Sequence, residues 1–278
     1  MKKGFLAYVK LQTKLFRKNF IKSTSRKNFD EIHDYRVALK RLRNIVNFIK
    51  QVPGGKNLKK CYVINDLQRA FRSGGVLREM QINRVLLSKH EQKTGIRYKG
   101  YRSYIKQHEK EAYWDLKIAR SRFSNDKLKK FESKMIGAIN VIPASKLSKH
   151  IDRYIVKRIA QIKKLVKDQN VESTLHRIRR ETKSIKYLLE MNLTSSKQYG
   201  DIQFELDIIT DLEDLIGDWH DQQVFKMDLE KYISTVEKRN SIDEATKKLM
   251  SRVSREYKKI FKQTVKAVYD HYKIPTGE

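Results

Sequence analysis

The sequence is poor in cysteine, proline and glycine. Its 278 residues include one cysteine, three prolines and 11 glycines. A single cysteine excludes an internal disulfide and suits a reducing compartment, and so few helix-breaking residues favour long helices. No apolar run approaches the roughly 18–20 residues of a membrane-spanning helix, and the N-terminal residues lack the apolar stretch of a signal peptide. These absences predict a cytoplasmic, helical protein that does not insert into a membrane.

Acidic residues are scarce beside basic ones. Lys and Arg total 62, whereas Asp and Glu total 32, which gives a net charge of +30. Such an excess opposes compaction and indicates a polyanionic partner, such as nucleic acid, an anionic membrane surface or a phosphate polymer. The excess is uneven: residues 1–142 hold 35 basic and 11 acidic residues (+24), and residues 143–278 hold 27 and 21 (+6).

Apolar residues recur with a period near 3.6, which is typical of amphipathic helices. Breaks in this pattern include the segments 53–55, 121–125 and 143–145. The helices predicted from the pattern span about 4–22, 30–51, 57–92, 98–140, 147–168, 172–193, 200–237 and 241–272. Gly75 and Gly217 lie inside the two long third helices, where we expect a kink or a break.

The two halves of the chain match at an offset of 143 residues, and a further segment matches at 142. The matched positions are Lys10 with Arg153, Lys14 with Lys157, His33 with His176, Arg36 with Arg179, Lys40 with Lys183, Arg43 with Lys186, Gly75 with Gly217, and Glu79 with Asp221. Chance would rarely keep three separate segments in one register. The repeat predicts an all-α fold made of two copies of a four-helix unit, residues 1–142 and 143–278, with a seam near Pro143.

A row of cations borders the apolar seam of the helix predicted at 30–51. His33, Arg36, Lys40 and Arg43 lie one residue, or about 100°, from that seam, and their row contains no carboxylate. Like charges at this spacing disfavour a helix by a few tenths of a kcal/mol per pair. A ligand whose negative charge repeats along its length would offset that cost. We interpret the row as an anion-binding stripe; the alternative is a solvated helix face.

The second half repeats the stripe with His176, Arg179, Lys183 and Lys186. A lone histidine beside a core is more often structural. Two histidines at matched positions, each followed by Arg three residues later, favour a role in binding, because an imidazole can donate a hydrogen bond to a phosphate oxygen.

Glu79 and Asp221 each follow a matched glycine by four residues. We predict that they pair with the cations or histidines of the stripes and hold them in place. General-base catalysis and a plain surface position are the alternatives for these two residues.

Sequence signatures of other chemistry are missing. There is no Gly-rich phosphate loop, no His and Cys cluster with zinc spacing and no nucleophile elbow. We therefore predict no catalytic residue, no metal site and no cofactor, and a protein that is not an enzyme.

The motifs together resemble a known family. The segment 33–43 is similar to the signature of the CHAD family, the conserved-histidine α-helical domain, and 176–190 is similar to its second copy. The segments 75–79 and 217–221 resemble the third-helix motifs of the two halves. The resemblance extends over about 4–272. It implies two four-helix bundles related by a pseudo-two-fold axis, a basic groove between them, and non-catalytic binding of inorganic polyphosphate.

The predicted ligand is therefore inorganic polyphosphate, with polyphosphate granules and polyphosphate-metabolising enzymes as further candidate partners. The candidate binding residues are Lys10, Lys14, His33, Arg36, Lys40, Arg43, Arg153, Lys157, His176, Arg179, Lys183 and Lys186. The alternative is a sequence-tolerant nucleic-acid binder, which is disfavoured because no aromatic residues that could stack on bases interleave with the stripes. Ser184 and Lys186 stand where the family commonly has arginine, so we expect the second stripe to be weaker.

Overall fold

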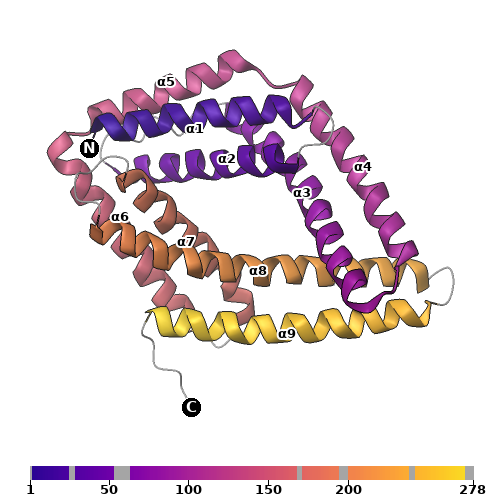
Figure 1. Ribbon diagram of the computed structural model, residues 1–278. Helices are drawn as coiled ribbons and strands as arrows, with labels where there is room; N and C mark the ends of the chain where they lie inside the picture. Colours follow the sequence, from indigo (N-terminus) through magenta and orange to yellow (C-terminus); the bar gives the residue numbers. More distant parts are fainter. Residues whose placement is uncertain are drawn as a thin grey trace.

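The computed structural model describes residues 2–24, 29–52, 63–167, 171–193, 200–237 and 242–272. Within these ranges all regular structure is helical, which confirms the all-α prediction (Figure 1). The helices are α1 (Lys2–Lys22), α2 (Phe29–Ile49), α3 (Val63–Thr94), α4 (Lys99–Ser121), α5 (Asn125–Val141), α6 (Ala144–Val166), α7 (Val171–Leu193), α8 (Gly200–Glu237) and α9 (Glu244–Tyr272).

The helix predicted at 98–140 is two helices, α4 and α5, divided at the break in the apolar pattern. Ser124 is extended and caps α5, because its side chain accepts a hydrogen bond from the Lys127 backbone N–H at 3.3 Å. Both α3 and α8 continue through Gly75 and Gly217, so the break expected at these glycines is absent.

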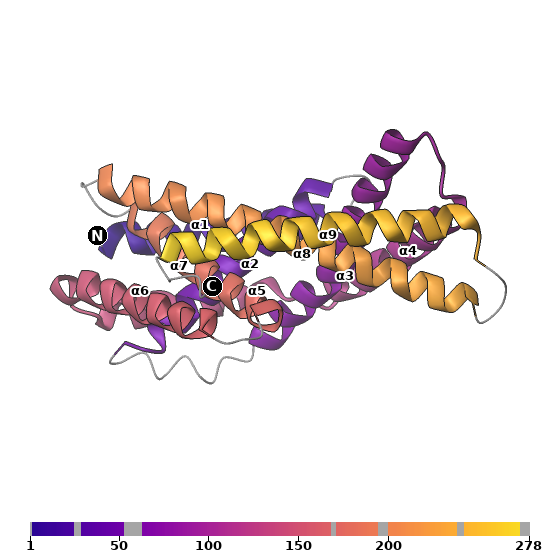
Figure 2. The same ribbon diagram turned by 90° about the horizontal axis from the view of Figure 1, so that it is seen from below.

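The helices form a four-sided frame (Figure 1). Helices α1, α2 and α5 lie along one side, α3 and α4 along the next, α8 and α9 opposite the first, and α6 and α7 along the last. The view from below shows α9 running along α8 (Figure 2). The pairs α1–α2 and α3–α4 recur as α6–α7 and α8–α9. This order is compatible with the predicted duplication, with α5 as an extra helix whose end at Val141 precedes the predicted seam at Pro143.

Within the described ranges, three apolar cores hold the frame together. The first joins α1, α2 and α5 to parts of α3 and α4 and to the facing ends of α6 and α7. It contains the whole predicted α2 seam, namely Ile32, Tyr35, Leu39, Leu42, Val46 and Ile49. The second core lies among α6, α7, α8 and α9. The third packs Leu87 and Tyr101 of the α3–α4 hairpin against Phe225 and Val253 of the α8–α9 hairpin. Because two of these cores include residues from both halves, the repeats pack as one body.

None of the helices in the described ranges is long and apolar enough to cross a membrane.

A close approach between α2 and α3 depends on a glycine. The Tyr35 hydroxyl is buried and donates a hydrogen bond to the Ala70 carbonyl oxygen at 3.2 Å. A Cβ atom on Gly74 would lie 1.5 Å from that hydroxyl oxygen. Any larger residue at position 74 would therefore displace a fully buried ring.

We expect Gly74→Ala to lower the free energy of unfolding by about 1–3 kcal/mol through overpacking. Gly137→Ala is the matched control, because a Cβ atom there meets nothing within 4 Å on the exposed face of α5. It should raise the stability by up to about 1 kcal/mol, the usual gain of alanine over glycine inside a helix. Urea unfolding followed by circular dichroism measures both, and equal effects would contradict the close approach of Tyr35.

Candidate anion-binding site

Helix α2 meets α7 where the two sequence repeats adjoin. The Asn44 side-chain amide donates to the Ser184 carbonyl oxygen at 3.0 Å, and the Arg41 guanidinium lies 5.7 Å from the centre of the Tyr187 ring. At the offset of 143, Asn44 corresponds to Tyr187 and Arg41 to Ser184, so the two contacts exchange partners. Such reciprocity is expected of contacts across a two-fold axis.

The α2–α7 contact brings the two cationic stripes together. Burial lowers the pKa of Lys40 to about 6, and the charges of Lys183, Arg36 and Arg179 contribute to the same shift. Burial and the charge of Arg179 likewise lower the pKa of Lys183. Lys40 and Lys183 are matched positions of the repeat, so each stands near its own counterpart. We call Arg36, Lys40, Arg179 and Lys183 the central cluster.

Both glycines lie beside an arginine of this cluster, and Gly75 makes room for Arg36. Arg36 donates through Nη1 to the Phe71 carbonyl oxygen at 2.5 Å, and its guanidinium lies 4.4 Å from the centre of the Phe71 ring. A Cβ atom on Gly75 would lie 2.9 Å from Nη1 of Arg36. A Cβ atom on Gly217 would lie 3.9 Å from Nη2 of Arg179. Arg36 therefore depends on the small residue at position 75, whereas a Cβ atom on Gly217 would make only an ordinary contact with Arg179.

Glu79 and Asp221 lie beside the same arginines. Burial raises the pKa of Glu79, and the charge of Arg36 lowers it in part. Burial also raises the pKa of Asp221, and the charges of Arg179 and Arg78 lower it in part. The arginines thus favour the ionised carboxylates, and the carboxylates can in turn hold the arginines in the cluster.

Arg78 and His220 also belong to the site, although the sequence did not single them out. After burial, the charge of Arg78 is the largest influence that lowers the pKa of His33. The His220 ring lies 5.1 Å from that of His176. Burial, the charge of Arg179 and other nearby cations lower the pKa of His220 to about 3. The sequence does place each residue directly before a predicted carboxylate, and the two positions match at the offset of 142. This match could have identified them as candidates.

Glu213 of α8 is a carboxylate that the sequence patterns did not indicate. It accepts contacts from Lys183 Nζ at 2.6 Å and from Lys186 Nζ at 3.2 Å. The second stripe has no carboxylate in its own row, but a neighbouring helix supplies one. The position matched to Glu213 at the offset of 142 is Phe71, which is apolar.

Eight predicted binding residues lie outside the central cluster; His33, His176 and Lys186 adjoin it, and the other five do not. These five are exposed on α1, α2 and α6: Lys10, Lys14, Arg43, Arg153 and Lys157. In the described part of the chain, none of the five is among the principal charged neighbours of Lys40, Lys183 or His220. Arg43 borders a separate cavity of about 260 Å³ between α2, α3 and α5.

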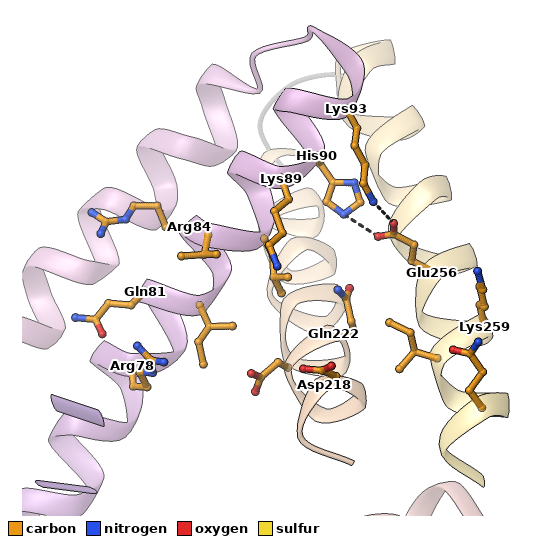
Figure 3. Close-up of a pocket in the computed structure, with 16 residues that line it drawn as sticks. Arg78, Gln81, Arg84, Lys89, His90, Lys93, Asp218, Gln222, Glu256 and Lys259 are labelled. Carbon is orange, nitrogen blue, oxygen red and sulfur yellow. Dashed lines mark hydrogen bonds and ion pairs between the residues drawn. The ribbon is translucent and has the colours of Figure 1, made fainter. Parts of the chain in front are cut away.

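A larger cavity of about 760 Å³ adjoins the site between α3, α8 and α9. Arg78 and Asp221 line it at the end near the central cluster, and Figure 3 shows His90, Lys93 and Glu256 at the other end. Lys93 contacts Glu256 at 2.8 Å, and His90 contacts it at 3.3 Å. Within the described ranges, no group of three or more His, Cys, Asp or Glu side chains is placed to hold a metal ion.

The lowered pKa of Lys40 predicts a stability cost in the ligand-free protein. Between about pH 6 and about pH 10 the unfolded chain holds a proton on Lys40 that the folded protein releases, so stability rises with pH in that window. Lys40→Met removes this cost, and we expect the melting temperature at pH 7 to rise by about 2–4 °C. The difference from wild type should shrink towards pH 10.

Lys10→Met, on the exposed face of α1, is the control and should leave the melting temperature unchanged. A lower melting temperature for Lys40→Met would show that the Lys40 ammonium stabilises the fold.

Comparison with known proteins identifies the family. The family model of the CHAD domain matches residues 7–199, and the match ends before α8. The crystal structure of the CHAD domain from the plant Ricinus communis is similar to this chain with a TM-score of 0.66 and 14% identity. That similarity covers 99% of this chain and 92% of the plant chain, and at this identity it shows the fold alone. No curated protein matches the chain. Because the family model covers more than half of its length, the chain belongs to the CHAD family.

Proposed function

We propose that the protein binds inorganic polyphosphate, without turnover, across the α2–α7 contact. The observation that carries the proposal is the central cluster, in which basic side chains from the two halves lie close enough for their charges to help lower the pKa of Lys40 and of Lys183. A bound polyanion relieves this repulsion and favours the protonated form of Lys40. Arginine can present two N–H groups to phosphate oxygens, and lysine supplies a mobile point charge.

A polymer suits the site better than a single phosphate. The cations come from two matched sets, so a ligand that reaches both makes its second contact at a high effective concentration. The cavity beside Arg78 and Asp221 offers space along α3, α8 and α9 for a further part of the ligand. A chain of phosphates can extend from the central cluster into that space.

Aromatic residues near the site do not favour nucleic acid. Trp219 and Tyr35 are fully buried, so neither can stack on a base. The Phe71 ring is half-buried and covered by the Arg36 guanidinium. Since sequence-tolerant binding of single strands relies on exposed stacking rings, we favour polyphosphate over the nucleic-acid alternative. In this proposal the protein is cytoplasmic and meets polyphosphate as free polymer, in granules or beside polyphosphate-metabolising enzymes.

Long-chain polyphosphate is expected to displace a labelled single-stranded oligonucleotide from the protein when both are present at equal phosphate concentration. Fluorescence anisotropy at two salt concentrations measures the competition, because salt weakens both complexes. Free phosphate, assayed in the same samples with magnesium present, should stay at the level of a protein-free blank. Retention of the oligonucleotide, or dependence on base identity, would favour a nucleic-acid ligand instead.

Both halves are expected to contribute to affinity, the first more than the second. Arg36→Gln with Lys40→Gln should weaken polyphosphate binding about 10- to 100-fold, on the scale of one net charge-assisted hydrogen bond. Arg179→Gln with Lys183→Gln should cost about 3- to 10-fold, because Glu213 already neutralises part of the second stripe. Isothermal titration at fixed salt measures these losses.

The matched control is Arg177→Gln with Arg180→Gln, an equal change of charge on the exposed face of α7. Losses as large as those of the central-cluster variants would mean that net charge alone, rather than the site, determines binding.

A further inference from the structure

We propose that Glu213 is an internal competitor of the polyanion, which limits binding to the second stripe and thereby favours long polyphosphate chains over short ones. The inference rests on the proposed function. It assigns to a carboxylate of α8 a role that the cationic stripes alone do not predict.

The geometry of Glu213 places it where a phosphate group would bind. Its two carboxylate oxygens contact different lysines, Oε1 with Lys183 and Oε2 with Lys186, at 2.6 and 3.2 Å. All three side chains are largely buried, with 12–16% of their surface exposed. The charge of Glu213 also acts on Lys40 across the α2–α7 contact. The carboxylate therefore holds two cations of the second stripe in the ligand-free protein.

The first half has no equivalent of this carboxylate at the matched position, which Phe71 occupies. Phe71 supports Arg36 with its ring and its backbone carbonyl. An aromatic ring can hold a guanidinium in place while leaving its positive charge available to a ligand. At these matched positions, therefore, the apolar residue Phe71 supports Arg36 of the first stripe. The anionic residue Glu213 pairs with Lys183 and Lys186 of the second stripe.

This difference has a consequence for binding. A phosphate that binds Lys183 and Lys186 must first displace Glu213. One set of charge-assisted hydrogen bonds then replaces another, so the net gain in binding free energy is small. A short anion has few other contacts to offset the exchange. A long chain that is already bound to Arg36 and Lys40 presents its next phosphates at high effective concentration and can complete the exchange. Glu213 thus reduces the affinity for short anions more than the affinity for long ones.

The test compares Glu213→Gln with Asp214→Asn, which makes the same change in net charge at the neighbouring exposed position of α8. Binding of tripolyphosphate and of long-chain polyphosphate is measured by isothermal titration over a range of salt concentrations. We expect Glu213→Gln to raise the affinity for tripolyphosphate about tenfold and that for the long chain about threefold. The salt dependence should become steeper by about one or two released ions. Asp214→Asn should change either affinity by no more than about twofold.

A second measurement tests the same displacement. Lys186→Met should cost several-fold more affinity in the Glu213→Gln background than in wild type, because only there is the lysine available to the ligand. Circular dichroism and thermal unfolding monitor the fold. If Glu213→Gln unfolds, Glu213→Leu replaces it, because an apolar side chain there imitates Phe71 of the first half.

Two results would overturn the inference. Weaker binding by both variants of Glu213 would show that the carboxylate keeps Lys183 and Lys186 charged and in position for the ligand. Equal gains for short and long chains would show that it does not discriminate by length. Failure of the wild-type protein to bind either polyphosphate would refute the proposed function itself, and this result can be recognised before any variant is made.

Discussion

Repulsion among cations at the α2–α7 contact is the constraint on which the rest of the structure depends. Lys40 stands beside Lys183 with Arg36 and Arg179 near by, and burial strengthens the repulsion because less water screens the charges. An arrangement of this kind is unfavourable by itself. It persists because the packing around it prevents α2 and α7 from separating, and because the cluster can lower its charge when Lys40 releases its proton.

The packing that resists this repulsion lies on several sides of the contact. The first apolar core holds α2 against α1 and reaches the end of α7. The third core joins the far ends of the two long hairpins. Close to the cations themselves, the ring of Trp219 is fully buried and lies 4.9 Å from His176. The charged groups are thus attached to helices that are fixed elsewhere, which preorganises them for an anion.

The sequence predicted most of the helices and the face of each stripe, because the apolar period reports which side of a helix is buried. It could not report how far along α2 the partner helix makes contact. Arg36 and Arg43 differ by seven residues and share one face, yet they are about 10 Å apart along the helix axis. Crossing helices touch over a short length, so Arg36 belongs to the central cluster and Arg43 borders a different cavity. The sequence could not predict the role of Glu213 for a related reason. Glu213 contacts Lys183 and Lys186 because α8 packs on α7, and the spacing of residues within either helix does not determine that packing.

Duplication itself explains why like charges meet. A residue close to a two-fold axis contacts its own copy, so a cationic row placed there necessarily faces a second cationic row. The reciprocal contacts of Asn44 with Ser184 and Arg41 with Tyr187 are compatible with such an axis between α2 and α7. Glu79 and Asp221, at matched positions, reduce the repulsion in both halves. The copies differ at Glu213, which corresponds to Phe71. Glu213 thus adds to the second half a carboxylate that the first half lacks at the matched position. In the proposed function, a polyanion with repeated charges neutralises the positive charge that remains in the central cluster.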